Sequence, residues 1–253
     1  MRSGPAGRAI AVACALIVAA ASSAAADGAR DIASVTATTY FDGTWRLETS
    51  NVVLVRIIPA LTLEERFLRV DSAGWNQLVF FIGPVVNFSD TLYAGAVYGL
   101  GIDSLGAYSH ELTAGLSYET DTTATSLGVK ADWFPATGYA YFLPSISGKF
   151  HPLPALGLFG KFFLSVDTAG VVTESFWGEA DYRFTPVIAA RAGFTVSRAN
   201  AFGYSGIAGI DLTFSESFAL RYSIQYLSDT VEYLTEPQPR SGIANTLIVD
   251  VKP

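Results

Sequence analysis

From residue 27 onwards, apolar and polar side chains alternate one by one through segment after segment of the chain. In the stretch 218–227, Leu220 and Tyr222 fall on one face of an extended backbone. Arg221 and Ser223 fall on the opposite face. A side-chain period of two is typical of a β-strand whose two faces meet different environments. The alternation therefore predicts an all-β fold.

The alternation divides the chain into fourteen expected strands. Most of them are about ten to fifteen residues long, whereas soluble strands average about five or six residues and a tilted membrane strand needs about nine to eleven. The expected strands are 32–41, 44–58, 61–70, 75–88, 91–103, 106–120, 123–134, 139–150, 156–168, 171–184, 186–198, 203–215, 218–228 and 243–252.

The amount of apolar sequence is typical of a membrane protein, but its distribution is not that of a helical one. Hydrophobic residues make up 50% of the chain and charged residues only 15%, against about 25% charged in an average soluble domain. Beyond residue 26 no apolar run approaches the roughly 18 residues of a membrane helix. The longest, Leu78 to Val86, contains Gly83 and Pro84. Two architectures remain, a soluble all-β protein or an outer-membrane β-barrel.

Aromatic residues favour the membrane barrel. Five of them lie on the apolar face of their strand, directly before an even-numbered turn: Phe88, Tyr118, Phe150, Phe184 and Phe214. Trp75 and Trp133 stand next to odd-numbered turns. Recurrence at one end of the strands is typical of the aromatic girdle at a membrane interface. A general preference of aromatic residues for strands explains their number but not this recurrence.

The turns suggest an orientation. Periplasmic turns of outer-membrane barrels are short and outer loops are longer, and the one long loop, 229–242, is odd-numbered. We therefore expect the odd turns to face outside. Fourteen strands without an N-terminal plug predict an open channel unless this loop folds inward. Tyr233 and Arg240 are then the gate candidates, and a plain surface loop is the alternative.

Two segments, 44–58 and 61–70, alternate poorly. Their charged residues are hard to place on one face: Arg46, Glu48, Arg56, Glu64, Glu65, Arg66 and Arg69. The preferred architecture is an antiparallel up-and-down transmembrane β-barrel of 14 strands, formed by residues 27–253. Merging or dropping two segments gives the alternative of 12 strands.

Residues 1–26 have the pattern of a secretory signal peptide. Arg2 and Arg8 precede and flank an apolar stretch, Ala9 to Ala21, and the small residues 24–26 suit cleavage before residue 27. The single cysteine, Cys14, would leave with this segment, so no disulfide scaffold or multi-cysteine metal site is expected. The 23 acidic against 16 basic residues argue against a nucleic-acid partner.

The polar faces of the strands should point into the barrel. The charged candidates on these faces are Glu111, Glu119, Lys130, Asp132, Lys149, Lys161, Glu179, Asp181, Arg183, Arg191, Asp211 and Arg221. They can pair with one another, because an unpaired buried charge is costly, or line a path for solutes, and both can hold together. Aromatic residues on the same parity would partly fill the lumen: Phe81, Tyr93, Phe159, Phe163 and Trp177.

The sequence does not favour an enzyme. The only histidines are His110 and His151. Ser109 and Glu111 flank His110, but neighbours on a strand point to opposite faces, so these residues cannot form a local catalytic triad. No metal-ligand spacing, nucleophile motif or cofactor motif occurs. We expect no metal and no cofactor.

The segment Ala107 to Arg198 resembles the YaiO-like barrels through the stretches GLSYE, ADWFP, FWGEADYRF and AGFTVSR. Those barrels are similar to the barrel domains of exopolysaccharide-export proteins. The resemblance implies a small bacterial outer-membrane β-barrel. It rests on architecture and not on a catalytic motif.

Three functional hypotheses follow. The first is a small channel or porin-like or envelope-accessory barrel of the bacterial outer membrane, in contact with membrane lipid and with small polar solutes or polysaccharide. The second is a structural or surface-interaction barrel with a filled lumen. The third is a lipid-modifying enzyme. The solute, the gating and the oligomeric state stay open.

Overall fold

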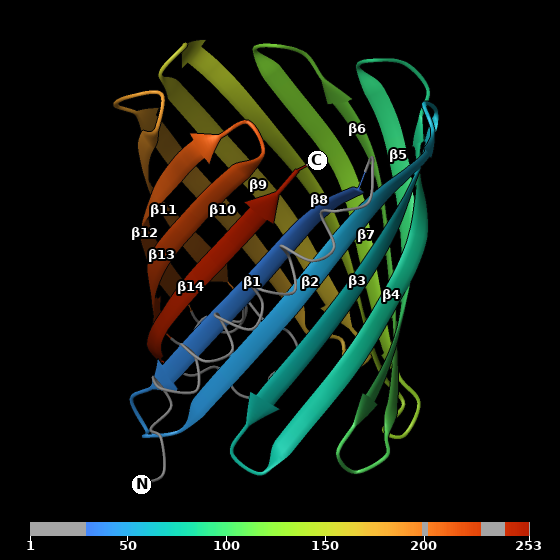
Figure 1. Cartoon of the computed structure of the whole chain (residues 1–253). Helices are drawn as coiled ribbons and strands as arrows, with labels where there is room; N and C mark the ends of the chain where they lie inside the picture. Colours follow the sequence, from blue (N-terminus) through green and yellow to red (C-terminus); the bar gives the residue numbers. More distant parts are fainter. Residues whose placement is uncertain (1–28, 199–201, 229–240, 253) are drawn as a thin grey trace, which may run out of the picture.

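The computed structural model describes residues 29–198, 202–228 and 241–252, and in this part of the chain fourteen antiparallel strands form one closed barrel (Figure 1). The strands are β1 (Ala29–Tyr40), β2 (Trp45–Ile58), β3 (Leu61–Ser72), β4 (Trp75–Asn87), β5 (Leu92–Asp103), β6 (Tyr108–Glu119), β7 (Thr123–Phe134), β8 (Tyr139–Leu153), β9 (Leu156–Asp167), β10 (Val172–Arg183), β11 (Ile188–Arg198), β12 (Phe202–Ser215), β13 (Phe218–Ser228) and β14 (Gly242–Val251).

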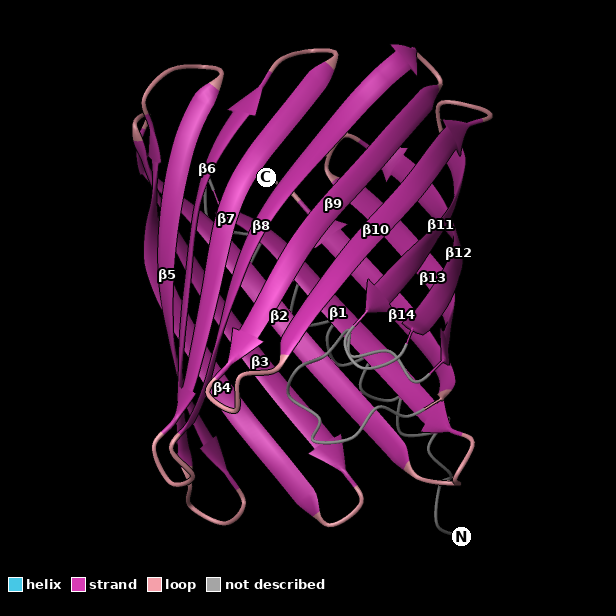
Figure 2. Ribbon diagram, turned by 180° about the vertical axis from the view of Figure 1, so that it is seen from behind, coloured by secondary structure: helices cyan, strands magenta, loops and turns pink. Residues whose placement is uncertain are grey.

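Each strand pairs with its neighbours in sequence, and β1 pairs with β14 to close the sheet. The closing register runs from Asp31 opposite Val251 to Tyr40 opposite Gly242. Closure leaves no unpaired strand edge, which a lipid environment requires. Figure 2 shows the strong tilt of the strands against the barrel axis, as closure of a sheet demands. The predicted fourteen strands are confirmed, and the alternative of twelve is wrong.

The odd-numbered turns depend on glycine. Gly43, Gly74, Gly106, Gly138 and Gly170 all have positive φ values between 67° and 84°. They occupy the first five odd-numbered turns, at the lower end of Figure 1. Such a backbone suits glycine because it has no Cβ to clash. These turns therefore connect the strands with very few residues.

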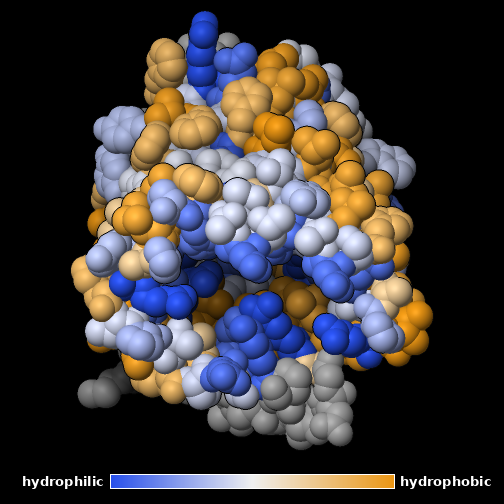
Figure 3. Space-filling view, turned by 90° about the horizontal axis from the view of Figure 1, so that it is seen from above, coloured by the Kyte–Doolittle hydropathy of each residue, from blue (hydrophilic) through white to orange (hydrophobic). Residues whose placement is uncertain are grey.

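The outer wall of the barrel is apolar. Phe80, Leu100 and Leu127 belong to a large set of exposed hydrophobic residues, Leu127 with 54% of its surface accessible. Seen from the end with the even-numbered turns, hydrophilic residues gather around a hollow and hydrophobic residues lie at the sides (Figure 3). An apolar surface of this extent belongs in hydrocarbon and not in water.

The interface aromatics predicted before the even-numbered turns are all exposed on this outer wall: Phe88, Tyr118, Phe150, Phe184 and Phe214. Trp133, near an odd-numbered turn, is exposed as well and stacks on His110 with 5.2 Å between ring centres. Within the described residues, no helix is long and apolar enough to span a membrane. The predicted signal peptide, residues 1–26, lies outside the described residues.

The two segments that alternate poorly form the complete strands β2 and β3. Register explains their charges. On β3, Glu64 and Arg66 lie opposite Gly83 and Phe81 and share the inner face with them. Glu65 and Arg69 lie opposite Ile82 and Leu78, on the outer face. The charges thus divide between the two faces, which is why no single polar face is visible in the sequence.

Candidate functional site

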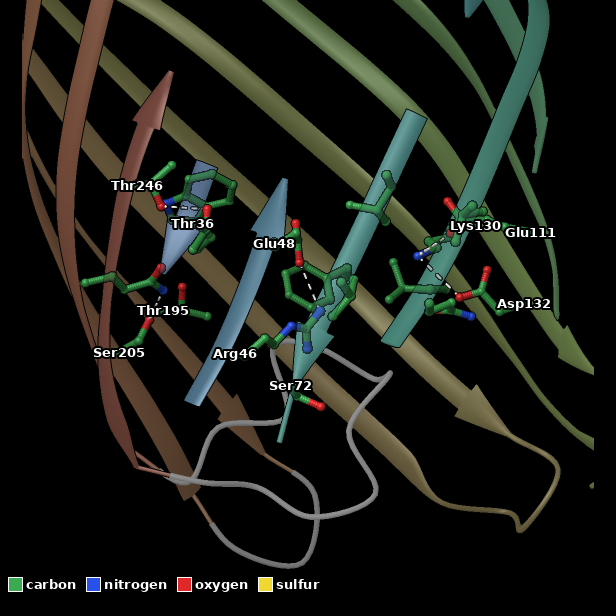
Figure 4. A pocket seen from close by; sticks show the side chains of 18 of the residues that line it. Thr36, Arg46, Glu48, Ser72, Glu111, Lys130, Asp132, Thr195, Ser205 and Thr246 are labelled. Atoms are coloured by element: carbon green, nitrogen blue, oxygen red, sulfur yellow. Dashed lines mark hydrogen bonds and ion pairs between the residues drawn. The ribbon is translucent and has the colours of Figure 1, made fainter. Parts of the chain in front are cut away.

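A cavity of about 1150 Å³ lies inside the barrel, lined by the inner faces of every strand except β5. Figure 4 shows side chains from widely separated strands converging on this space. The lining contains charged, hydroxyl-bearing and aromatic side chains. A cavity of this size is in the range that holds a small ligand or solute.

One charged group of the lining stands on β6 and β7. Lys130 Nζ lies 3.0 Å from a carboxylate oxygen of Glu111 and 3.3 Å from one of Asp132. The Tyr141 hydroxyl donates a hydrogen bond to Asp132 from the neighbouring strand β8. The Asp132 side chain is 5% accessible, so its negative charge depends on these partners.

A second charged group lies on β10, β11, β12 and β13. Arg191 of β11 lies 4.0 Å from Glu179 of β10 and 3.7 Å from Asp211 of β12. Asp211 also pairs with Arg221 of β13 at 3.2 Å. Only Arg191 of this group borders the cavity itself. The group therefore holds four strands together beside the cavity.

Hydroxyl and amide side chains cover much of the remaining lining. Thr36 and Thr246 share a hydrogen bond of 2.9 Å across the closing strands β1 and β14. Gln77 donates to the Ser109 hydroxyl at 2.9 Å. Neutral hydroxyls of this kind can bind water or the polar groups of a solute without a charge of their own.

The lumen also contains an apolar cluster. Phe81 is 2% accessible and packs with Val79 and Val97, with Leu68 beside them. Gly99 makes this packing possible, because a Cβ at this position would lie 2.4 Å from the Phe81 ring. The side of the lumen formed by β3, β4 and β5 is therefore partly filled.

The twelve predicted lumen charges fall into three groups. Those that border the cavity are Glu111, Lys130, Asp132, Lys161 and Arg191. Those that form ion pairs nearer the even-numbered turns are Lys149, Asp181, Glu179, Asp211 and Arg221. Glu119 and Arg183 are exposed at that end of the barrel. The predicted gate residues Tyr233 and Arg240 lie outside the described residues.

Some of the aromatic residues predicted to point inward line the cavity, and others contact neighbouring side chains. Phe163 and Trp177 line the cavity. Phe159 packs edge-on against Trp177, with 5.2 Å between ring centres. The Tyr93 hydroxyl lies 3.5 Å from the Glu119 carboxylate.

Trp75 is not an interface aromatic facing lipid. It lines the cavity, and its indole N–H donates to Asp103 at 3.3 Å. The reason is parity, because Trp75 shares its face of β4 with Gln77 and Phe81, which point inward. The position of Trp75 next to an odd-numbered turn predicts an interface residue, but the alternation of β4 places Trp75 inside the barrel.

Sequence reasoning missed several cavity residues. Arg46 and Glu48 of β2 both line the cavity and pair at 2.9 Å. Tyr141 is equally part of the lining. An Arg and a Glu two residues apart share a face of any strand, so this spacing could have identified the pair despite the poor alternation around it.

The histidines do not form a catalytic group. His110 Nδ1 lies 2.6 Å from the Tyr98 hydroxyl on the outer wall, and its ring stacks on Trp133. His151 lies at the other end of the barrel, near the even-numbered turn after β8. Over the described residues, no group of three or more His, Cys, Asp or Glu side chains is placed to hold a metal ion.

Comparison with solved structures shows the same architecture. The Pseudomonas putida toluene transporter TodX matches with a TM-score of 0.62 and 9% identity, covering 90% of this chain and 91% of that one. A bacterial polysaccharide outer-membrane secretin matches at 0.60 and 8% identity, covering 88% and 98%. An anion-selective porin from Comamonas acidovorans matches at 0.50 and 11% identity, covering 88% and 97%.

These likenesses confirm the predicted fold of a bacterial outer-membrane β-barrel. The apolar outer wall agrees with this fold, because a membrane-spanning barrel faces lipid on that side. The three descriptions name a transporter, a secretin and a porin, and none of them names an enzyme. No protein-family model and no curated protein matches the sequence, so the YaiO-like resemblance stays a prediction.

Proposed function

We propose that the protein is a small channel of the outer membrane that passes small polar solutes through its lumen. The observation that supports this most directly is the cavity of about 1150 Å³ inside a closed barrel, lined by charged and hydroxyl-bearing side chains. The transporter and porin folds among the similar structures agree with it. On this proposal the predicted partners are membrane lipid outside and solutes inside.

The paired charges fit such a lumen. The inner wall has both signs of charge in neighbouring strands, and Lys130 lies between Glu111 and Asp132. Paired groups keep the wall polar without strong attraction for either sign of ion, which suits passage rather than tight retention. The predicted kinship with YaiO-like barrels, and with it a polysaccharide as cargo, is a narrower form of the same proposal.

Single-channel recording after reconstitution in a planar bilayer tests the proposal. The only cysteine of the chain is Cys14, so a cysteine placed in the barrel can be labelled selectively in protein with Cys14 replaced. Gln225 borders the cavity, whereas its neighbour Ile224 is exposed on the outer wall. A water-soluble thiol reagent should reduce the current of Gln225→Cys and leave that of Ile224→Cys unchanged.

The competing function is a structural barrel with a filled lumen. The buried cluster around Phe81 favours it, because this cluster occupies one side of the interior. Such a barrel would show no conductance at any voltage. Absence of conductance in the reconstituted wild-type protein would refute the channel proposal.

A further inference from the structure

One cation of the cavity differs from the others in its partners. Arg46, Lys130 and Arg191 each have a carboxylate within ion-pair distance. For Lys161, on β9, the described part of the chain supplies no such carboxylate. Its ammonium nitrogen lies instead 5.8 Å from the centre of the Phe163 ring.

The surroundings of Lys161 are aromatic. Trp177 of β10 lies directly opposite it in the register, and Phe159 and Phe163 stand two residues away on the same face of β9. Ser147 is its partner on the other side, on β8. Phe163 and Trp177 border the cavity together with Lys161.

This combination is suited to one type of ligand. An ammonium group without a counter-charge in a partly apolar cavity is costly, and an anion bound beside it reduces that cost. The flanking ring faces can cover a flat apolar body. A single ammonium matches a single negative charge, whereas a dianion such as phosphate would leave one charge without a partner.

We propose that Lys161, Phe163 and Trp177 form a binding site for a small aromatic carboxylate, of which benzoate is the simplest. The carboxylate accepts a hydrogen bond from Lys161 Nζ, and the ring packs against Phe163 and Trp177. The inference deepens the proposed channel function, because it names a class of solute for the lumen. Binding itself requires access to the cavity but not passage through it.

Four probes separate the two parts of the site. Benzoate has the ring and the negative charge, acetate has only the charge, benzyl alcohol only the ring, and benzylamine a ring with the opposite charge. Calorimetry on the barrel in lipid nanodiscs, with empty nanodiscs as reference, measures binding. We expect benzoate to bind at least tenfold more tightly than the other three. Benzyl alcohol and benzylamine lack the carboxylate that accepts a hydrogen bond from the charged Lys161, and acetate lacks the ring that packs against Phe163 and Trp177.

Variants assign the charge to one residue. Lys161→Met should weaken benzoate binding about tenfold or more and remove the preference over benzyl alcohol. Lys161→Arg keeps the charge and should retain the preference for benzoate. The matched control is Lys149→Met, because Lys149 pairs with Asp181 at 3.6 Å and does not border the cavity. Heat-modifiable migration on a semi-native gel verifies that each variant is folded.

The outcomes distinguish this inference from the channel proposal. Benzoate binding that is equal in wild type and Lys161→Met, or acetate binding as tight as benzoate, overturns the site even if the barrel conducts. Benzoate binding that depends on Lys161 in a barrel without conductance supports the site and refutes the channel. Absence of benzoate binding in a barrel that conducts refutes the site alone.

Discussion

Two adjacent glutamates of β3 should respond in opposite ways to the same substitution. Glu64 points into the lumen, where its carboxylate accepts a hydrogen bond from Arg66 at 2.7 Å. Glu65 lies near the middle of β3 on the outer face, between its register partners Val53 and Ile82. We expect Glu65→Leu to stabilise the barrel in a bilayer and Glu64→Leu to destabilise it.

The magnitudes follow from the two environments. A lipid-facing Arg or Lys at the middle of a bilayer costs about 2–4 kcal/mol and a Glu somewhat less, so Glu65→Leu should gain about 1–2 kcal/mol. Glu64→Leu leaves the Arg66 guanidinium, 5.1 Å above the Phe81 ring, without its carboxylate. That pair is only partly shielded from water, so we expect a loss of about 1–2 kcal/mol rather than the full cost of a buried charge.

Reversible urea unfolding in lipid vesicles, followed by tryptophan fluorescence, measures both changes. With a slope of about 1–3 kcal/mol per molar urea, the two midpoints should differ by roughly 1 M or more. The urea midpoint of the double variant, with both Glu64→Leu and Glu65→Leu, should fall between the midpoints of the two single variants. A shift of both midpoints in the same direction, or a more stable Glu64→Leu, would show that the assignment of faces on β3 is wrong.

Three further substitutions test other parts of the barrel. Gly99→Ala should destabilise the protein by about 1–3 kcal/mol in the same unfolding assay, because its Cβ meets the Phe81 ring; Phe81→Leu in the same chain should restore much of the loss, and a lack of rescue would contradict the packing described. Lys130→Met leaves its two carboxylates without a cation, so the reversal potential in a KCl gradient should shift toward cation selectivity, and an unchanged potential would place Lys130 outside the ion path. Gly170→Ala, at a φ of 78°, should cost about 1 kcal/mol, whereas an equal or higher midpoint would argue against that backbone.

The strands could be predicted from the sequence because the two faces of a half-buried strand meet different environments, so that apolar and polar residues alternate along it. The poorly alternating β2 and β3 were the exception, and they are the reason why a barrel of twelve strands stayed an alternative. The faces of Glu64 and Glu65 could not be assigned from the sequence. Those faces follow from the register with neighbouring strands. Register is a property of two chain segments together, so no single segment reveals it.

The cavity was less predictable than the fold. Parity placed Lys130 and Lys161 on the inner face equally, yet one is held between two carboxylates and the other stands beside an aromatic ring. This difference depends on which side chains the neighbouring strands bring opposite each lysine. The space left in the lumen likewise depends on the volume of neighbouring side chains. At Gly99, for example, the missing side chain leaves room for the ring of Phe81.

The ion pairs of β2 and β3 have a consequence for how the barrel assembles. Arg46 pairs with Glu48, and Glu64 with Arg66, in each case two residues along a single strand. Such a pair can form while the strand has no neighbours, because the contact closes almost no loop. Arg191, in contrast, finds its carboxylates only on the adjacent strands. The hairpin of β2 and β3 can thus enter a bilayer with these four inner charges already paired. Arg30 of β1, however, pairs with Asp250 of β14 and finds this partner only when the barrel closes, and the later wall likewise needs its strands side by side.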